Sequence, residues 1–364
     1  MKFLDIYNQD QILHKKIKQD INKIINNSDF ILGDKVFEFE KKFANYCNTK
    51  YSVSCANGTD ALYLAIQALN LPKDSEVLIP AMTYCSTLFS VIRCGLKPVL
   101  VDIDKGKSTI SPDQIKKKIT KKTRLIIIVH LYGDMPNLLE IDKVLRSKKI
   151  FIIEDASQAH GAYDYSKKKP VRAGSYGKLA CFSLYPGKNL GAYGDAGIIT
   201  TNDKKKINHI SKYRNIGSDK KFYHDLVGVN SRLDTIQAAI LLNKMKLLDK
   251  QNKRRENIAK IYYKNIKNNT IEKLNYSRGC VYHQYVVITK KINFFIKHLK
   301  KNKIPFGRHY PFPLHKLKAV SKIFKGEKYK NSERLAKFGI SLPVNPLLKD
   351  KEILKICRII NNFN

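Results

Sequence analysis

Three short segments of the sequence carry residue types that can do chemistry. The run Asn57-Gly58-Thr59-Asp60 stands before an apolar helical stretch, so its backbone N–H groups and its hydroxyl can bind a phosphate at a helix N-terminus. Asp155 follows an apolar strand pattern, at the kind of strand end where parallel sheets bind ligands, and its carboxylate can hold a positive charge. Lys188 lies in the glycine-rich segment 183–197, where desolvation lowers a lysine pKa and favours Schiff-base chemistry.

Each segment also has a simpler structural interpretation. Thr59 and Asp60 are good helix caps, and Asp155 can cap the turn that follows its strand. Lys188 is one of many lysines in a basic chain. Taken singly, the structural interpretation is favoured for the helix end and for Lys188, whereas the two interpretations of Asp155 are evenly matched.

The elements that must position these groups alternate between strands and helices. Six short apolar runs are typical of strands buried on both faces: 76–79, 98–101, 125–129, 150–153, 179–182 and 197–200. Helical patterns lie between them, and one starts at Ser111-Pro112, an N-cap followed by proline at the first helical position. Repeated strand–helix units predict an α/β fold with a largely parallel sheet wrapped by helices.

The N-terminal and C-terminal segments do not show this alternation of strands and helices. An amphipathic helix is expected at 11–27, and a long helical pattern at 233–266 is expected to bridge two domains. A strand at 283–289 and a helix at 293–301 then indicate a smaller C-terminal α+β domain. We expect a large domain at 1–245, which includes the N-terminal helix, and a small domain at 246–364.

The composition excludes several classes of protein. Of the 364 residues, 68 are Lys or Arg and 31 are Asp or Glu, which gives a net charge of +37, yet 43% hydrophobic residues are enough for a folded core. The lysines are spread along the whole chain without an aromatic-basic or Cys/His finger pattern, so a solvated basic surface is favoured over nucleic-acid binding. A polyanionic small substrate remains compatible with this charge.

Cellular location and metal content are also constrained. Apolar runs are too short to span a membrane, and Asp5 and Asp10 interrupt any signal-peptide pattern, so a cytoplasmic protein without membrane attachment is expected. The seven cysteines are scattered and never in Cys-x-x-Cys spacing, which argues against a disulfide framework and a metal site.

In this order and spacing, the three segments resemble the sugar aminotransferases of the DegT/DnrJ/EryC1/StrS family. The resemblance covers nearly the whole chain. Its motifs are Asn57 to Leu62, Glu154 to Gly161, Ser183 to Gly197, Phe3-Leu4-Asp5, Ile31-Leu32-Gly33, Phe39-Glu40, Val129 to Gly133, Gly228 to Leu233, Gln237 to Ala239, His309 to Pro311 and Pro313 to His315. It implies a pyridoxal-phosphate enzyme of fold type I, related to aspartate aminotransferase, with a mostly parallel seven-stranded sheet in the large, cofactor-binding domain.

The resemblance also implies roles for single residues. Lys188 is expected to join the cofactor as a Schiff base and later to move a proton between Cα and C4′. Asp155 is expected to pair with the pyridinium nitrogen, which keeps the ring able to accept electrons. Gln158 is expected to hydrogen-bond the cofactor's phenolic oxygen.

The remaining cofactor contacts follow from the same resemblance. Tyr84 is placed where the family stacks an aromatic ring on the cofactor, although ordinary core packing is its simpler role. Gly58, Thr59 and Ser183 are expected to hold the phosphate. Asn230 is expected to reach that phosphate from the neighbouring subunit, which implies a homodimer with shared active sites.

The amino-acid sequence around Lys188 resembles that of one subgroup of the family, the enzymes that aminate C3 of a dTDP-linked 3-keto-6-deoxyhexose. It implies that L-glutamate donates the amino group, leaves as 2-oxoglutarate, and yields a dTDP-3-amino-3,6-dideoxyhexose, of gluco or galacto configuration, for surface glycans such as lipopolysaccharide O-antigen. Tyr185, His309, Tyr310 and His315 are the candidate contacts to the sugar or its pyrophosphate.

Other functions stay open. Within the family, the alternatives are a C4-aminotransferase and an aminotransferase for UDP-linked sugars, while Lys188 argues against the dehydratase branch, which has histidine there. A catalytically silent regulatory or binding protein is the non-enzyme alternative. One position departs from the sequence pattern of the family. Asp134 occupies a position where a neutral residue is more common, and we expect it to alter a loop near the cofactor.

Overall fold

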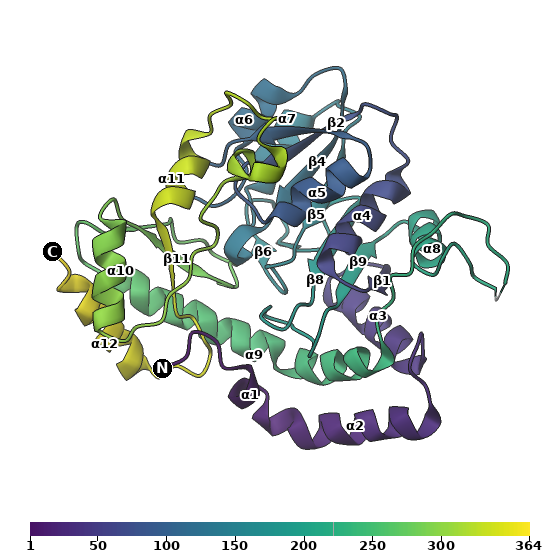
Figure 1. Ribbon diagram of the computed structural model, residues 1–364, viewed down its shortest axis with the longest axis horizontal. Coiled ribbons are helices and arrows are strands. Elements are labelled where there is room, and N and C mark those ends of the chain that lie inside the picture. Colours follow the sequence, from purple (N-terminus) through teal and green to yellow (C-terminus); the bar gives the residue numbers. More distant parts are fainter. Residues whose placement is uncertain (221) are drawn as a thin grey trace.

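Seven strands in the order β1-β9-β8-β5-β4-β2-β3 form the central sheet of the computed structural model, which describes residues 1–220 and 222–364 (Figure 1). The strands are β1 (Tyr51–Cys55), β2 (Glu76–Pro80), β3 (Lys97–Val101), β4 (Thr123–Val129), β5 (Phe151–Asp155), β8 (Leu179–Ser183) and β9 (Gly197–Thr201). The five from β8 to β3 pair in parallel, and β9 pairs antiparallel with both β8 and β1. The expected mostly parallel seven-stranded sheet is therefore confirmed.

The apolar strand runs arise because the sheet is covered on both faces. In β4, Leu125 and Ile127 belong to one core layer, whereas Ile126 and Ile128 belong to the other. The flanking helices are α3 (Asp34–Tyr46), α4 (Gly58–Leu69), α5 (Cys85–Arg93), α6 (Pro112–Lys118), α7 (Leu138–Leu145) and α8 (Lys204–Tyr213). Helices α4, α5 and α8 cover the first layer, and α3, α6 and α7 cover the second.

A smaller α+β unit follows the large one in the chain. Its antiparallel sheet has the order β10-β11-β12 (Glu272–Lys273, Tyr285–Ile288, Gly339–Leu342), and its helices are α10 (Ile292–Lys301), α11 (Lys330–Phe338) and α12 (Asp350–Asn361). The expected strand and helix of this unit are both present, with bounds that differ by at most two residues at the strand's N-terminus. The strand begins two residues late because His283 and Gln284 turn toward the large domain instead of pairing in the sheet.

Helix α9 (Thr235–Asn265) connects the two units, as the long helical pattern predicts (Figure 1). Its first half packs in the large core through Ala238 and Leu241, and its second half packs in the small core through Ile258 and Tyr262. The division at residue 245 falls inside this helix and stays a prediction.

The N-terminal segment lies against α9. It consists of α1 (Ile6–Gln9), a 3-10 turn (Gln11–Leu13) and α2 (His14–Asn27), so the expected helix at 11–27 begins as a tighter turn. Leu13 and Ile17 pack on Ile240 of α9. The remaining elements are short: β6 (Tyr163–Asp164), β7 (Val171–Arg172) and 3-10 turns at Leu131–Gly133, Leu314–Lys316 and Lys318–Val320.

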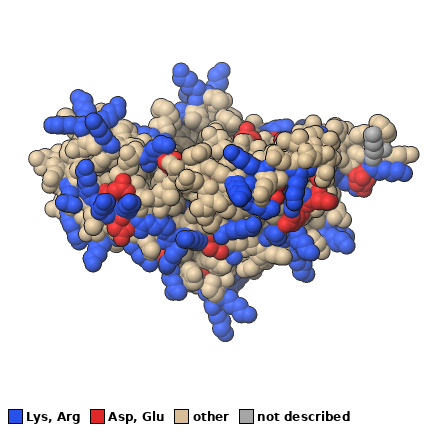
Figure 2. All heavy atoms as spheres, turned by 90° about the horizontal axis from the view of Figure 1, so that it is seen from below, with Lys and Arg blue, Asp and Glu red and all other residues tan. Residues whose placement is uncertain are grey.

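The surface carries its charge broadly. Figure 2 shows Lys and Arg side chains scattered over the whole of one face, as their even spread along the sequence predicts. None of the helices in the described part of the chain combines the length and the apolar character needed to cross a bilayer.

Candidate active site

A cavity of about 560 Å³ opens where the carboxyl ends of β4, β5 and β8 meet the N-terminus of α4. This is the edge at which parallel sheets bind ligands. Ten of the twelve predicted site residues line it, so the structure brings together groups that lie far apart in the sequence: Gly58, Thr59, Tyr84, Asp155, Gln158, Ser183, Tyr185, Lys188, His309 and Tyr310.

Lys188 extends from the tight loop between β8 and β9. Its backbone N–H donates to the carbonyl of Tyr185 at 2.9 Å, and a Cβ at Gly191 would lie 2.5 Å from the carbonyl oxygen of Pro186, so the loop tolerates only glycine there. Burial lowers the pKa of the Lys188 amine to about 8, although the negative charge of Asp155 opposes this shift. A large neutral fraction of the amine is therefore present near pH 8, as nucleophilic and proton-transfer chemistry requires.

Asp155 is the last residue of β5, and only 5% of its surface is exposed. Its Oδ2 accepts a hydrogen bond of 2.8 Å from the hydroxyl of Thr87 on α5, and its Oδ1 accepts one of 3.3 Å from the backbone N–H of Ser157. These contacts hold the carboxylate in one orientation at the cavity wall. Thr87 is a supporting residue that the sequence did not indicate.

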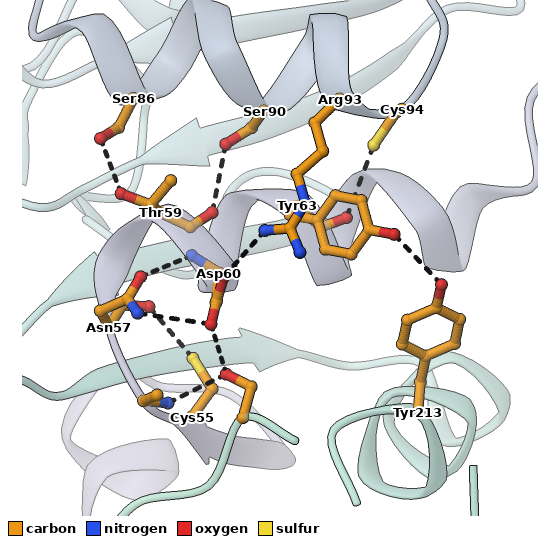
Figure 3. A network of polar contacts seen from close by, with 12 residues as sticks. Cys55, Asn57, Thr59, Asp60, Tyr63, Ser86, Ser90, Arg93, Cys94 and Tyr213 are labelled. Atoms are coloured by element: carbon orange, nitrogen blue, oxygen red, sulfur yellow. Dashed lines mark hydrogen bonds and ion pairs between the residues drawn. The ribbon is translucent and has the colours of Figure 1, made fainter. Parts of the chain in front are cut away.

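The N-terminus of α4, where a phosphate is expected, forms one end of the cavity. Asn57 caps the helix by accepting the N–H of Asp60 at 2.8 Å, and the first-turn N–H groups of Gly58 and Thr59 have no partner within the helix. A Cβ at Gly58 would lie 2.6 Å from the Cβ of Ser183, so glycine allows the helix end to approach β8. The Thr59 hydroxyl contacts the Ser86 hydroxyl at 2.7 Å (Figure 3).

Asp60 connects this helix end to the segment that carries Asn230. The hydroxyl of Ser231 donates to Asp60 at 2.8 Å. Arg93 pairs with the same carboxylate at 3.1 Å (Figure 3). Asn230 itself is exposed and lies outside the cavity. Within one chain, its side chain forms no hydrogen bond with Gly58, Thr59 or Ser183, the residues expected to hold the phosphate.

Gln158 and the aromatic residues form the opposite wall. The Gln158 side chain accepts the backbone N–H of Tyr132 at 2.7 Å and donates to the hydroxyl of Tyr310 at 3.0 Å. The ring of Tyr310 lies 5.4 Å from that of Tyr84, which is 54% exposed toward the opening. The hydroxyl of Tyr132 donates to the carbonyl of His309.

His315 is the predicted substrate contact that the structure places elsewhere. It is buried outside the cavity, where its Nε2 lies 2.9 Å from a carboxylate oxygen of Glu333 and its ring packs on Tyr329. In this arrangement it stabilises the loop after Pro313, and its role as a substrate contact stays a prediction.

Further cavity residues carried no chemical signal of their own in the sequence. Phe3 and Leu4 from the N-terminal segment line the opening, and the ring of Phe3 stacks on His309 with centroids 6.1 Å apart. His283 lines the inner wall. Phe3 and Leu4 belong to a motif that resembles the family, but only the folded chain shows that they reach the site.

Comparisons with known proteins agree with this geometry. The model of the DegT/DnrJ/EryC1/StrS aminotransferase family matches residues 11–361. The chain is 40% identical to the dTDP-3-amino-3,6-dideoxy-alpha-D-galactopyranose transaminase of Aneurinibacillus thermoaerophilus, over 99% of both chains. It is 36% identical to the UDP-2-acetamido-2-deoxy-3-oxo-D-glucuronate aminotransferase of Pseudomonas aeruginosa, over the full length of both.

Solved structures share the fold along the whole chain. The crystal structure of DesV from S. venezuelae superposes with a TM-score of 0.93 at 31% identity and covers 99% of this chain and 97% of its own. That of ntda from Bacillus subtilis, with bound cofactor PMP, superposes with a TM-score of 0.89 at 26% identity and covers 100% and 85%.

The cavity residues fit pyridoxal phosphate on three structural grounds. The amine of Lys188 has no hydrogen-bond acceptor among the described residues and faces the cavity, so it is free to bond an aldehyde. Asp155 offers a fixed carboxylate for a protonated ring nitrogen. The first-turn N–H groups of α4, at Gly58 and Thr59, have no partner within the helix and can bind a phosphate.

Asp134 lies behind the cavity rather than in it. It lines a separate space of about 30 Å³ together with Lys107, Ser277 and Gln284, and Gln284 also lines the active-site cavity. The Oδ1 of Asp134 is buried with no partner among the described residues. Burial raises the pKa of this carboxyl to about 6, which the neighbouring Ser277 and Lys107 oppose.

We expect the variant Asp134→Asn to be more stable than the wild type above pH 6. Because the native carboxyl binds its proton more tightly than the unfolded one, wild-type stability falls as pH rises from about 4 to about 6, whereas the amide does not titrate. The gain at pH 7 is about 1–3 kcal/mol. Urea unfolding of both proteins at several pH values measures it, and a difference that does not change with pH would contradict the burial argument.

Proposed function

This chain belongs to the DegT/DnrJ/EryC1/StrS aminotransferase family, and we propose that it transfers the amino group of L-glutamate to C3 of a dTDP-linked 3-keto-6-deoxyhexose. It is a nucleotide-sugar aminotransferase that uses pyridoxal phosphate. The products are 2-oxoglutarate and the dTDP-3-amino-3,6-dideoxyhexose, a building block for surface glycans. The observation that carries the proposal is the amine of Lys188 and the carboxylate of Asp155 in one cavity beside the N-terminus of α4.

The chemistry divides between the cofactor and the chain. When bound, pyridoxal phosphate supplies an aldehyde that carries the amino group and a ring that accepts the electrons of a broken C–H bond. Lys188 holds the cofactor covalently and moves the proton through Nζ, and its lowered pKa keeps much of the released amine neutral. Asp155 keeps the ring nitrogen protonated, and Gln158 orients the ring through its phenolic oxygen.

The remaining residues bind and orient. Gly58, Thr59 and Ser183 hold the phosphate, and Tyr84 stacks on the ring. Both the amino donor and the sugar react beside Lys188, so in this proposal they bind in turn and the reaction is ping-pong.

The proposed sugar site lies at the opening of the cavity. Tyr185 is 58% exposed there, and His309 and Tyr310 face it from the loop before Pro311. Similarity to the dTDP-sugar transaminase supports the 3-keto-6-deoxyhexose. A UDP-linked 3-keto uronate is the second candidate, because the similarity to the P. aeruginosa enzyme also extends over the full length of both chains.

A second subunit completes the site in this proposal. Asn230 is exposed and stands next to Ser231, which is anchored to the phosphate-binding end of its own subunit through Asp60. An exposed amide on an anchored segment can reach the phosphate of a partner in a two-fold dimer. We therefore propose a homodimer in which each Asn230 serves the other subunit's cofactor.

We expect Lys188→Ala to lose cofactor attachment and turnover together. Borohydride reduction of the wild type with pyridoxal phosphate should label the peptide that contains Lys188, and L-glutamate should bleach the visible absorption of that adduct. In the variant both signals disappear and kcat falls by about 10³-fold or more, because the nucleophile and the proton carrier are lost. Lys290→Ala, at an exposed turn, is the control. A label on other lysines only would refute the assignment.

We expect the enzyme to prefer dTDP-linked 3-keto-6-deoxyhexoses over other keto sugars. Wild-type protein is supplied with L-glutamate and, in turn, the gluco and galacto 3-keto sugars, a dTDP-4-keto-6-deoxyhexose and a UDP-linked 3-keto uronate. The preferred sugar should have a kcat/KM at least about 10-fold higher, and NMR of the product should place nitrogen on C3. A C4-linked product, or preference for the UDP sugar, would select one of the alternatives.

We expect two inactive variants to restore activity when their subunits are mixed. If Asn230 serves the partner's site, a hybrid of Lys188→Ala and Asn230→Ala subunits has one site with an intact lysine and an intact partner asparagine. Random exchange should then recover about a quarter of wild-type activity at limiting cofactor. Each parent alone is the control. If Asn230 acts within its own subunit, no intact site forms and no activity returns.

A further inference from the structure

Residues 3–13, which we call the N-terminal strap, connect the active-site cavity with helix α9. Phe3 and Leu4 line the cavity at one end of the strap, and Leu13 packs on Ile240 of α9 at the other end. Between these ends, Asp5 caps α1 by accepting the backbone N–H of the helix. The strap therefore adds side chains to the cavity that come from outside the central sheet and its loops.

At the cavity, the strap contacts the same side as the candidate sugar-binding residues. The ring of Phe3 stacks on that of His309, with the centroids 6.1 Å apart and an angle of 29° between the ring planes. A Cβ at Gly187 would lie 3.6 Å from Cδ2 of Leu4 and 3.5 Å from the ring of Tyr185, so Leu4 lies beside the loop between β8 and β9. The strap thus meets the cavity where the sugar is proposed to bind.

Phe3 and Leu4 supply apolar surface to this side of the cavity. Both side chains are half-buried, so a bound molecule can cover apolar atoms that otherwise contact water. Ligand sites combine such apolar walls with a few polar groups that fix the orientation of the ligand, and His309 and Tyr310 supply polar groups here. An aromatic ring held by a second ring presents a fixed face to the C–H groups of a hexose.

The two substrates of the proposed reaction differ in length. Both react beside Lys188, but L-glutamate is a short chain, whereas the hexose carries a diphosphate and a nucleoside. Tyr185, next to Leu4, is 58% exposed, which places this part of the wall at the opening of the cavity. The nucleotide sugar therefore passes Phe3 and Leu4, and the amino donor contacts them less.

A buried ion pair fixes the strap. The carboxylate of Asp10 lies 2.8 Å from Nζ of Lys244 on α9, and the two side chains are 1% and 6% exposed. The hydroxyl of Tyr193, from the loop between β8 and β9, donates to this carboxylate at 3.4 Å, and its ring centroid lies 5.0 Å from the same Nζ. Since a buried charge is costly without its partner, the pair holds the strap on α9 and on the lysine loop at one point.

We propose that Phe3 and Leu4 are specificity-determining residues, which form a wall that binds the nucleotide sugar, and that the ion pair of Asp10 and Lys244 positions this wall. The inference rests on the proposed function, in which the sugar and the amino donor react in the same cavity. The strap then acts on one of the two half-reactions. Binding of the sugar depends on it, whereas cofactor attachment and the reaction with L-glutamate do not.

The first experiment compares Phe3→Ala/Leu4→Ala with the wild type, using whichever of the four keto sugars the wild type aminates. In a ping-pong reaction, kcat/KM for each substrate reports its own half-reaction. The value for the sugar should fall about 10-fold or more, because apolar contacts are lost, and that for L-glutamate should change less than about twofold. Ile12→Ala, in the same strap and with a side chain 76% exposed, is the matched control. An unchanged value for the sugar, or an equal loss for both substrates, would overturn the proposal.

The second experiment tests the anchor of the strap with a double-mutant cycle. Lys244→Met leaves the carboxylate of Asp10 without its counter-charge, so kcat/KM for the sugar should fall about 5-fold or more. In the Phe3→Ala/Leu4→Ala background the same change should have little further effect, because the wall is already lost. A merely structural role would lower kcat/KM by the same factor in both backgrounds, and that result would refute the positioning role.

Thermal unfolding checks that each variant is folded. If Lys244→Met does not fold, Asp10→Asn/Lys244→Met takes its place in the cycle, because it removes both buried charges together. The first experiment does not depend on this pair, so it decides the role of the wall in either case.

Failure of the proposed function is distinguishable from failure of this inference. If pyridoxal phosphate does not label Lys188, or the wild type aminates none of the sugars, the function fails and the inference fails with it. If the wild type aminates a sugar and Phe3→Ala/Leu4→Ala does so equally well, only the role of the strap is lost.

Discussion

The site depends on one constraint: the amine of Lys188 is partly withdrawn from water but forms no ion pair. Lys188 is only partly exposed, in the wall of the cavity, and Asp155, whose negative charge acts on its amine, is fixed by Thr87 and Ser157 instead of bonding that amine. The enclosed amine is thereby held ready to lose its proton, and the carboxylate is held for another partner. A direct salt bridge between the two would have stabilised the ammonium and blocked both roles.

The fold supports this arrangement by placing packed strands and a helix end around the side chain of Lys188. Asp155 and Ser183 end two neighbouring parallel strands, and the strands are covered on both faces by apolar layers. Gly58 lets α4 approach within van der Waals distance of β8. Because each anchor belongs to a packed element, the distance between the N-terminus of α4 and the lysine loop changes little.

The sequence predicted those parts of the fold and of the site that depend on local sequence patterns. The buried strands were predictable because two-sided burial leaves long apolar runs, whereas β1 was missed because Ser52 and Ser54 interrupt its pattern. Of the twelve site residues predicted from the resemblance, ten meet in one cavity. Thr87 and His283 could not be assigned a role, since their chemistry arises from neighbours that only the folded chain supplies.

Helix α9 takes part in both hydrophobic cores without interruption, and Asn252 on its middle turns contacts the residue after Lys188. When one core unfolds, its half of α9 frays, and this destabilises the other half of the helix and the core that it belongs to. The two units therefore unfold as one cooperative block rather than in sequence. Over evolutionary time, neither unit could be exchanged for a foreign domain without also replacing the floor of the active site.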